Sequence, residues 1–430
     1  MILVTGVMIC LLPNCCFLSE TSRMLEIHRA LRARGAEVRV AVHGGPYEQA
    51  LVDAGVPLDR LGGSWTEERC RAFVGSLPGI GPPGQSMWTD DELRTYARAE
   101  AAYFRSHGIR AAVTGWTLTA LLSTRLAGIP LVTEHAGSFL PPVFERGLLP
   151  APSRPIGMPG ERWLPERVRR WMFNRGPTRL TIYTAGFNRV AAELGVEGVP
   201  SFPALLLGDL TLATDVPEVL GVPRAELDAW KPRDPTRYRS GTRLRYTGPI
   251  YAKLPMPVPE SVERFLARPG KTVYVAITSS SAELVREVVT ALQGIDVDIL
   301  VAGTVHDLSD LGGEQVLVKG VLPSHEIMPR VGLAVTAGGQ GSVQTALASG
   351  VPLIGIPLQP EQDANVVFAE RRGAARLVPR DFAGTAALAD TAREMLTDDR
   401  YRDNARRLQA IFAQVDGPGA AADAILELVA

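Results

Sequence analysis

Short apolar runs alternate with longer helical patterns along most of this chain. In the first half, runs rich in Val, Ile and Ala stand at 2–8, 38–42, 111–114 and 131–133. After the first run, apolar residues with helical spacing fill 21–34, and Gly35 marks the end of that helix. A second helical pattern covers 118–127. Short buried strands that alternate with helices predict βαβ units and a parallel sheet covered on both faces.

The same alternation restarts after Pro249. Strands are predicted at 272–277, 297–302, 315–319, 332–336, 353–356 and 375–378, and helices at 282–292, 341–348, 362–372, 386–396 and 401–414. Since 430 residues exceed what one core usually serves, we expect two α/β domains. The predicted division is a domain at 1–214, a polar, proline-spaced linker at 215–246, a domain at 247–415 and a C-terminal helix at 416–430.

The segment 141–180 interrupts this alternation with many Pro, Gly and Arg residues. Its apolar residues have helical spacing after Pro165, which favours an ordered excursion over a disordered insertion. Trp163, Trp171 and Phe173 are candidates for the wall of a binding site for an acceptor substrate. The alternative is a pair of ordinary surface helices whose aromatic residues are buried.

Composition and charge argue against several classes of partner and site. The net charge is −1, which predicts no nucleic-acid or membrane partner held by bulk charge. The chain has four cysteines, no CxxC pair and six histidines, so we expect neither a disulfide framework nor a metal site. No apolar run reaches the roughly 18 residues of a membrane span, and the start lacks a signal-peptide pattern. These features predict a cytoplasmic protein.

The stretch 336–378 carries the most chemical information. A strand ends at Thr336, a turn with Gly338, Gly339 and Gly341 follows, and a helix begins near Ser342. Glycines let a backbone approach a phosphate closely, and a helix start presents unpaired N–H groups. After the next strand, Glu361 and Gln362 offer the acceptors and donors that sugar hydroxyls require.

The sequences GGxGS, ALxxGVPxxxxP and EQxxN at these spacings resemble the donor-binding signature of family-one glycosyltransferases. RYTGPI at 245–250, TVYVAITSSS at 272–281 and the first loop and helix at 17–38 are also similar to that family. The resemblance implies the GT-B fold, in which two Rossmann-like domains face each other across a cleft. It also implies transfer of a sugar from a UDP- or dTDP-sugar.

The resemblance assigns roles to individual residues. The donor diphosphate would be bound by Gly338, Gly339, Gly341 and Ser342, together with Thr278, Ser279 and Ser280. Val321 and Leu322 would line the base pocket, and Glu361 and Gln362 would bind the donor sugar. The serines at 279–281 also suit the N-cap of the helix at 282–292, and Glu361 also suits a helix start.

Three positions depart from the family pattern. Ala337 stands where the family has a phosphate-binding His, and no aromatic residue lies near Val321 to stack on a nucleobase. The family's catalytic His and its supporting Asp correspond to Ser19–Glu20–Thr21 and to the region of Trp116. Glu20 is the first candidate for the general base, because a base needs a carboxylate within reach of the acceptor. His135 is a second candidate, and an acceptor that needs no strong base is a third explanation.

The implied reaction is inverting, metal-independent sugar transfer without a cofactor, with the nucleotide sugar as co-substrate. The acceptor implied by the resemblance is a small natural product, as in antibiotic biosynthesis, and the protein would be a monomer or homodimer. The sequence leaves two alternative functions open. One is a catalytically silent nucleotide-sugar-binding partner of another transferase, and the other is a nucleotide-sugar epimerase or hydrolase.

Overall fold

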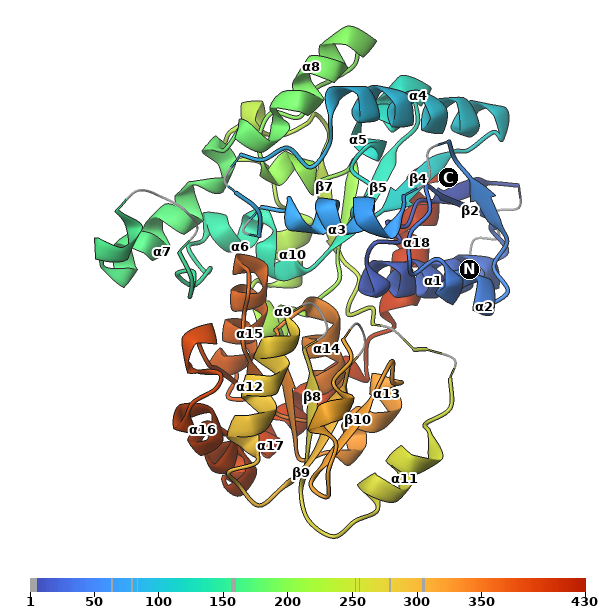
Figure 1. Ribbon diagram of the computed structural model, residues 1–430. Helices are drawn as coiled ribbons and strands as arrows, with labels where there is room; N and C mark the ends of the chain where they lie inside the picture. The colour runs from blue at the N-terminus through green and yellow to red at the C-terminus, as the bar shows by residue number, and fades with distance from the viewer. Residues whose placement is uncertain are drawn as a thin grey trace. The chain divides into compact units, whose positions relative to one another are not determined.

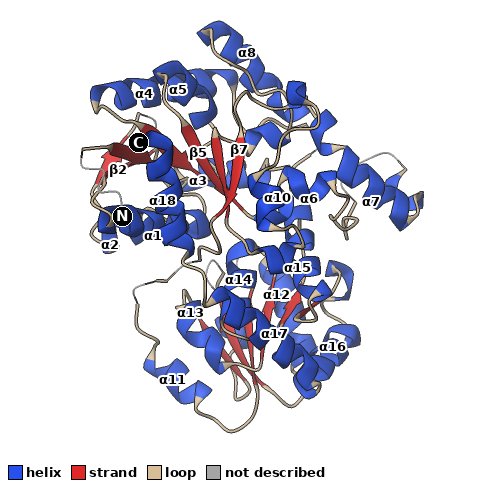
Figure 2. Ribbon diagram, turned by 180° about the vertical axis from the view of Figure 1, so that it is seen from behind, coloured by secondary structure: helices blue, strands red, loops and turns tan. Residues whose placement is uncertain are grey.

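The chain divides into two compact units. The computed structural model describes residues 6–62, 65–78, 80–82, 84–155, 160–251, 253–254, 256–277, 280–303 and 306–430. Unit 1 consists of the described residues of Met1–Ala151, Ile156–Ile250 and Asp416–Ala430, and unit 2 of those of Pro152–Pro155 and Tyr251–Val415. Figures 1 and 2 show the helices and strands of both units.

Unit 1 is built on a seven-stranded parallel sheet. Its strands are β1 (Met8–Leu11), β2 (Glu37–Val42), β3 (Leu58–Arg60), β4 (Ala111–Thr114), β5 (Leu131–His135), β6 (Leu210–Ala213) and β7 (Arg243–Tyr246). The spatial order is β3-β2-β1-β4-β5-β6-β7, so the chain runs outward in opposite directions from the β1/β4 pair. Loops that leave such a switch point diverge and make room for a ligand.

Helices of unit 1 lie on both faces of this sheet (Figures 1 and 2). They are α1 (Leu18–Ala33), α2 (Gln49–Asp53), α3 (Glu67–Gly75), α4 (Asp90–Ser106), α5 (Ala120–Ala127), α6 (Pro141–Glu145), α7 (Glu166–Arg175), α8 (Ala185–Leu194), α9 (Pro217–Leu220), α10 (Arg224–Asp228) and α18 (Gly417–Val429). Short 3-10 helices stand at Gly137–Phe139, Glu161–Trp163, Pro177–Arg179, Ile182–Thr184, Pro203–Leu205 and Pro235–Arg237. Side chains alternate along each strand, and this alternation separates two cores. Ile9 and Leu11 pack in the core with α1 and α18, whereas Cys10 packs in the core with α4 and α8.

Unit 2 repeats the arrangement with six parallel strands. They are β8 (Thr272–Ala276), β9 (Asp298–Ala302), β10 (Val316–Lys319), β11 (Leu333–Thr336), β12 (Leu353–Gly355) and β13 (Ala375–Leu377), in the spatial order β10-β9-β8-β11-β12-β13. The helices are α11 (Glu260–Leu266), α12 (Ala282–Leu292), α13 (Ser324–Ile327), α14 (Gln340–Ala348), α15 (Pro360–Arg371), α16 (Ala386–Thr397) and α17 (Asp399–Phe412), with 3-10 helices at Ser309–Leu311, Met328–Arg330 and Arg380–Phe382. The switch point of this sheet lies between β8 and β11. The predicted α/β class with two Rossmann-like parallel sheets is confirmed.

Two predicted boundaries need correction at the N-terminus. The first strand is Met8–Leu11 rather than 2–8, and residues 1–5 lie outside the described part of the chain. Cysteine packs as an apolar residue here, so the buried run extends through Cys10 to Leu12. α1 begins at Leu18 rather than at Thr21, which places Glu20 in its first turn.

The segment 215–246 is not a linker between the two units. It forms α9, α10 and β7, and β7 pairs with β6 in the sheet of unit 1. Leu244 and Tyr246 are buried in that sheet, although polar residues and prolines surround them in the sequence. The C-terminal helix α18 belongs to unit 1, and Pro152–Pro155 groups with unit 2. Contacts between segments far apart in the sequence therefore decide the division.

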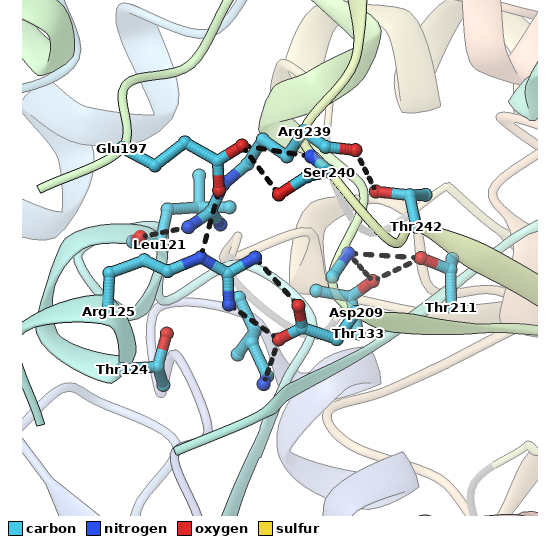
Figure 3. Close-up of polar contacts among 12 residues, drawn as sticks. Leu121, Thr124, Arg125, Thr133, Glu197, Asp209, Thr211, Arg239, Ser240 and Thr242 are labelled. Atoms are coloured by element: carbon cyan, nitrogen blue, oxygen red, sulfur yellow. Dashed lines mark hydrogen bonds and ion pairs between the residues drawn. The ribbon is translucent and has the colours of Figure 1, made fainter. Parts of the chain in front are cut away.

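A polar network closes the amino-terminal end of the unit 1 sheet (Figure 3). Arg125 binds both carboxylate oxygens of Asp209, at 2.8 and 2.7 Å, and its Nε lies 3.1 Å from Glu197. Asp209 also accepts the N–H of Leu131 at the start of β5. Burial alone would raise the pKa of Asp209, but the hydrogen bonds from Arg125 and Leu131 hold it below its usual range. The network is structural, because ligands of parallel sheets bind at the opposite, carboxyl ends of the strands.

The predicted ordered excursion at 141–180 contains α6 and α7, with 156–159 outside the described residues. Phe173 is half-buried against Phe139, with 5.9 Å between ring centroids. Trp163 and Trp171 are 90% and 61% exposed, so the alternative of surface helices with buried aromatic residues is wrong for both tryptophans. Within the described residues, no helix combines the length and apolar character needed to cross a bilayer.

Candidate functional site

The principal candidate site lies in unit 2, where the chain leaves β11 and enters α14. β11 pairs with β8 in the sheet, so the loops after these two strands start side by side at the switch point. The turn after β11 contains Gly338 and Gly339, and Gly339 is the N-cap of α14. The first intrahelical bond runs from the N–H of Val343 to Gly339. The helix therefore begins with N–H groups that have no partner from within the helix and that favour a negative charge.

Glycine stands at the three positions of the turn for different physical reasons. Gly338 has a φ of +83°, and a Cβ there would approach Val366 to 2.5 Å, so no other residue fits. At Gly339 and Gly341 a Cβ would meet nothing within 4 Å. These two glycines thus border open space, which lets another molecule approach the backbone closely. Ser342 is half-buried in the first turn of the helix and adds a hydroxyl there.

The predicted sugar-binding residues begin the neighbouring helix, α15. Asn365 of this helix donates to the carbonyl of Gly338 at 3.1 Å and to the carboxylate of Glu361 at 3.0 Å. Glu361 is half-buried, and Gln362 is 5% exposed, with its side-chain oxygen accepting the N–H of Leu358 at 2.8 Å. The structure therefore brings the glycine turn and Glu361 together, as the sequence predicted, and it assigns Asn365 as the residue that connects them.

Three further residues shape this site. Thr336 accepts the N–H of Gly338 with its hydroxyl at 2.8 Å, and Asn365 connects Gly338 with Glu361. Asp363 is 2% exposed and accepts the N–H of Ser153 at 3.2 Å. Burial raises the pKa of Asp363 to about 6, against hydrogen bonds from Ser153 that lower it. Asn365 stands in the EQxxN pattern, so spacing could have indicated it, whereas nothing in the sequence connects Asp363 with Ser153.

The serine loop after β8 is described in part. Thr278 and Ser279, both predicted to bind the diphosphate, lie outside the described residues. Ser280 donates to the carbonyl of Ile277 at 3.0 Å, and the side chain of Ser281 accepts the N–H of Leu284 at 3.4 Å. Ser281 is thus the N-cap of α12, which confirms the capping interpretation for this residue.

The two residues predicted to line the base pocket differ in exposure. Val321 is 41% exposed and follows β10, whereas Leu322 is 4% exposed. Leu322 accepts the N–H of Ser324 with its carbonyl oxygen at 2.9 Å. Val321 therefore offers an apolar surface beside the carboxyl edge of the sheet, and the Leu322 side chain is turned into unit 2.

Glu20, the predicted general base, joins two loops at the switch point of unit 1. One carboxylate oxygen accepts the N–H groups of Asn14 (3.0 Å), Gly115 (3.0 Å) and Trp116 (2.9 Å). Asn14 follows β1 and the other two residues follow β4, so Glu20 ties together the loops that diverge from this pair of strands. The residue is fully buried, and its second oxygen has no hydrogen-bond partner within the described ranges. Burial raises the pKa of Glu20 to about 7, against the bonds from Trp116 and Asn14.

His135, the second candidate, ends β5 and is 7% exposed. Its ring meets Trp116 edge-on at 5.8 Å between centroids. Burial and the nearby positive charge of Arg23 lower the pKa of His135 to about 3, against a hydrogen bond to the backbone of Leu206 that raises it. Arg23 itself is buried and bonds both oxygens of Glu134 at 2.8 Å. His135 is therefore neutral in solution near pH 7. In the described part of the chain, no group of three or more His, Cys, Asp or Glu side chains is arranged to hold a metal ion.

Comparison with known proteins agrees with a candidate site at β11, α14 and α15 of unit 2. Residues 239–419, which include β11, α14 and α15, match the family described as UDP-glucoronosyl and UDP-glucosyl transferase. The chain is a glycosyltransferase whose residues 239–419 match this family. The prediction that it is a sugar-transferring enzyme, made from the GGxGS and EQxxN patterns, is confirmed.

Relatives of this glycosyltransferase include a PGL/p-HBAD biosynthesis glycosyltransferase of Mycobacterium tuberculosis. It is 25% identical over 333 residues, which make up 76% of this chain and 73% of the relative. A demethyllactenocin mycarosyltransferase of Streptomyces fradiae is 35% identical over 130 residues, or 30% of this chain and 28% of the relative.

Solved structures show the same fold over nearly the whole length. Glycosyltransferase VinC, crystallised with dTDP, has a TM-score of 0.67 and 16% sequence identity, and the match covers 98% of this chain and 99% of VinC. The forosaminyltransferase SpnP has a TM-score of 0.65 and 15% identity, with coverage of 99% and 100%. The predicted GT-B fold class is confirmed by these neighbours.

Proposed function

We propose that this glycosyltransferase transfers a hexose from a UDP- or dTDP-sugar to a hydroxyl group of a small natural product, with inversion and without a divalent metal. The observation that carries the proposal is the start of α14 at the switch point of the unit 2 sheet. There Gly339 and Gly341 border open space, and Glu361 is linked to the same turn through Asn365.

The diphosphate is the group whose negative charge grows as the sugar leaves. The first N–H groups of α14, the hydroxyl of Ser342 and the helix dipole all favour that charge. Donors fixed by the fold stabilise the departing group without reorganisation, which is the basis of electrostatic catalysis. Because Ala337 supplies no positive charge here, the proposal assigns the diphosphate to backbone and hydroxyl groups, including Thr278, Ser279 and Ser280.

The sugar is assigned to Glu361 and Gln362. The carboxylate of Glu361 is held by Asn365, so it can accept from sugar hydroxyls in a fixed direction. The side-chain oxygen of Gln362 is occupied by Leu358, which leaves its amide N–H groups as donors to the sugar. Val321 and Leu322 are assigned to the base, with Val321 as the exposed contact.

The geometry favours a structural role for Glu20 over the role of general base. A general base must come within hydrogen-bond reach of the acceptor, and the fully buried carboxylate has no exposed surface from which to do so. His135, with its pKa lowered to about 3, is too weakly basic to take a proton efficiently near pH 7. We infer that the acceptor hydroxyl is itself acidic, as in a phenol with a pKa of about 10.

The test of donor binding is a titration with UDP, dTDP and their hexose conjugates. For the double variant Glu361→Ala/Gln362→Ala we expect weaker binding of the nucleotide sugar and unchanged binding of the free nucleoside diphosphate. If the variant bound the nucleotide sugar as tightly as the natural chain does, the sugar site would be wrongly assigned.

The test of the acceptor compares phenols with aliphatic alcohols of matched shape under one donor. We expect the phenols to react faster, because the fraction of ionised hydroxyl rises as its pKa falls. Equal rates across the series, together with a large loss of kcat in Glu20→Gln or His135→Gln, would instead assign a side-chain base. Incubation with the donor alone, followed by mass spectrometry and NMR of the sugar, separates transfer from a hydrolase or epimerase reaction. NMR is needed because an epimer has the same mass as the original sugar.

A further inference from the structure

The segment 163–182 of unit 1 exposes an unusual amount of apolar surface. Trp163, Trp171, Leu180 and Ile182 are 90%, 61%, 42% and 55% exposed. Within the described ranges, eight large apolar side chains are exposed, and these four make up half of them. Single exposed apolar side chains are ordinary, whereas several in one segment indicate a contact surface.

The same segment is strongly basic. Residues 160–182 contain six arginines and two glutamates, although the whole chain has a net charge of −1. Glu161 is 3% exposed, so one of the two negative charges lies inside the unit. Arg167, Arg170 and Arg175 are exposed, and within the described part of the chain none of them forms an ion pair. Their charge is therefore available to an external anion.

Helix α7 places three of the exposed side chains on one face. Arg167, Arg170 and Trp171 are three and four residues apart, so they share a face of the helix. Val168 and Met172 lie on the opposite face and are half-buried, and α7 packs against α6. At the C-terminal end, Asn174 accepts the N–H of Leu149 and donates to its carbonyl, both at 3.0 Å. The inner side of α7 is therefore fixed to unit 1, while Arg167, Arg170 and Trp171 are exposed. The helix lies at the periphery of unit 1 (Figures 1 and 2).

We propose that the α7 surface, defined as Trp163, Arg167, Arg170, Trp171 and Arg175, docks on an anionic lipid bilayer. Indole rings insert at the boundary between headgroups and acyl chains, and arginines beside them pair with lipid phosphates. This combination of exposed tryptophan and unpaired arginine fits such a boundary. Docking of the same face on a second copy is disfavoured, because a two-fold axis would bring like charges together. The docking is peripheral and does not depend on the donor site.

The test is co-sedimentation of the full chain with two kinds of vesicle, phosphatidylcholine alone and phosphatidylcholine mixed with phosphatidylglycerol. We expect the chain to bind the mixed vesicles and to be released by salt, since screening weakens the arginine contacts. Tryptophan fluorescence should shift to the blue on binding, because Trp163 and Trp171 leave water. The measurement needs no donor or acceptor, so its outcome is separate from that of the proposed function.

Two sets of variants distinguish the contributions. Trp163→Ser/Trp171→Ser should reduce vesicle partitioning by at least about tenfold, because burial of a large apolar side chain is lost twice. Arg167→Gln/Arg170→Gln/Arg175→Gln should reduce it by on the order of a hundredfold and remove the salt dependence. Matched controls are Phe382→Ser, a 51% exposed apolar residue of unit 2, and Arg98→Gln, an exposed arginine of α4. Neither control should change partitioning.

Three outcomes would overturn the proposal. The first is that the natural chain fails to bind mixed vesicles. The second is that it binds both kinds of vesicle equally. The third is that the tryptophan and arginine variants bind as well as the natural chain does. Analytical ultracentrifugation tests the alternative that a second copy of the chain binds the α7 surface. A dimer that dissociates in Trp163→Ser/Trp171→Ser, without vesicle binding, would assign the α7 surface to self-association instead.

Discussion

Glu20 shows how one buried carboxylate organises the carboxyl edge of the unit 1 sheet. Its single engaged oxygen accepts three backbone N–H groups from two loops that are far apart in the sequence, one at Asn14 and one at Gly115 and Trp116. Removing such an acceptor leaves buried donors unsatisfied, which costs roughly 1–3 kcal/mol for each. The charge is also costly, because burial and the nearby Glu134 raise the pKa of Glu20 to about 7, against the bonds from Trp116 and Asn14 and the charge of Arg23.

The first prediction separates these two effects of Glu20. Since the folded pKa of about 7 exceeds the ordinary value of 4.5, the folded state holds its proton more tightly than the unfolded state does. This group therefore lowers the free energy of unfolding as pH rises from 4.5 to 7, by about 3 kcal/mol in total. Glu20→Gln keeps the acceptor without the charge, so at pH 8 it should be at least as stable as the natural chain. Glu20→Ala should lose roughly 2–5 kcal/mol at pH 5, where the natural side chain is protonated, and less at pH 8, where its buried charge destabilises the natural chain.

The measurement is urea denaturation of the three proteins from pH 5 to pH 8. The difference between Glu20→Gln and the natural chain is the relevant quantity, because His135 contributes a slope of opposite sign. Its folded pKa of about 3 lies below the ordinary 6.5, so its contribution to stability is lost as pH falls below 6.5. A difference that does not change with pH would contradict the assignment of a raised pKa to Glu20.

The second residue prediction concerns Asn365, which bridges the glycine turn and Glu361. Asn365→Ala removes both hydrogen bonds, so the carbonyl of Gly338 loses a partner and the Glu361 carboxylate loses its fixed orientation. We expect kcat/KM for the nucleotide sugar to fall by roughly 10- to 100-fold, equivalent to about 1–3 kcal/mol. Initial rates at several donor concentrations measure this loss.

Asn404→Ala is the matched control for Asn365. Asn404 also donates its side-chain N–H to a glycine carbonyl, that of Gly373 at 3.1 Å, but it belongs to α17 and lies outside the candidate site. We expect it to reduce stability while leaving the kinetics of the donor nearly unchanged. Equal kinetic losses in the two variants would mean that Asn365 acts through general stability.

At the scale of elements, α18 connects the end of the chain to unit 1. Its apolar side packs with α1 in one core, where Ile425 is fully buried. Its polar side forms ion pairs of Asp423 with Arg34 and of Glu427 with Arg245, all partly exposed. Burial of apolar surface contributes more to the stability of the folded chain than exposed ion pairs do, because water already solvates the exposed charges in the unfolded chain.

The element prediction compares these two sides of α18. Ile425→Ala should lower the free energy of unfolding of unit 1 by about 2–4 kcal/mol through the cavity that it creates. Asp423→Asn should lower it by less than about 1 kcal/mol. Urea denaturation followed by circular dichroism measures both. A larger loss for Asp423→Asn than for Ile425→Ala would show that the ion pair, and not the core, holds α18 in place.

At the scale of the whole molecule, each unit has its own sheet, its own core and its own switch point. The residues assigned to the donor belong to unit 2, and the fully buried Glu20 and its loops belong to unit 1. Binding of a nucleotide to unit 2 should therefore stabilise that unit directly, by about 2.7 kcal/mol at a ligand concentration of 100 Kd.

The corresponding prediction is a local change in amide hydrogen exchange. Saturating UDP or dTDP should slow exchange at the start of α14, to which the diphosphate is assigned. The corresponding nucleotide sugar should also slow exchange at the start of α15, to which the sugar is assigned. The core strands of the unit 1 sheet, such as β1 and β4, should be unaffected. The nucleosides without phosphate serve as the control and should protect the turn much less. Protection confined to unit 1 would place the nucleotide elsewhere.

The small net charge of the whole chain conceals a local basic segment. The net charge of −1 led to the expectation of no membrane partner, but a sum over the chain hides a basic segment balanced by acidic residues elsewhere. The exposure of Arg167, Arg170 and Trp171 on one face of α7 became visible only in the structure, and it motivates the proposed membrane docking.

The sequence by itself determined the fold class, most strands and helices of unit 2, and the glycine turn before α14. These features depend on local periodicity and on short spacings, which a linear pattern records directly. Only the tertiary structure decided that 215–246 completes the first sheet, that α18 returns to unit 1 and that Asn365 bridges the turn and Glu361. It also decided that Glu20 is buried, because burial and pKa depend on neighbours that are distant in the sequence.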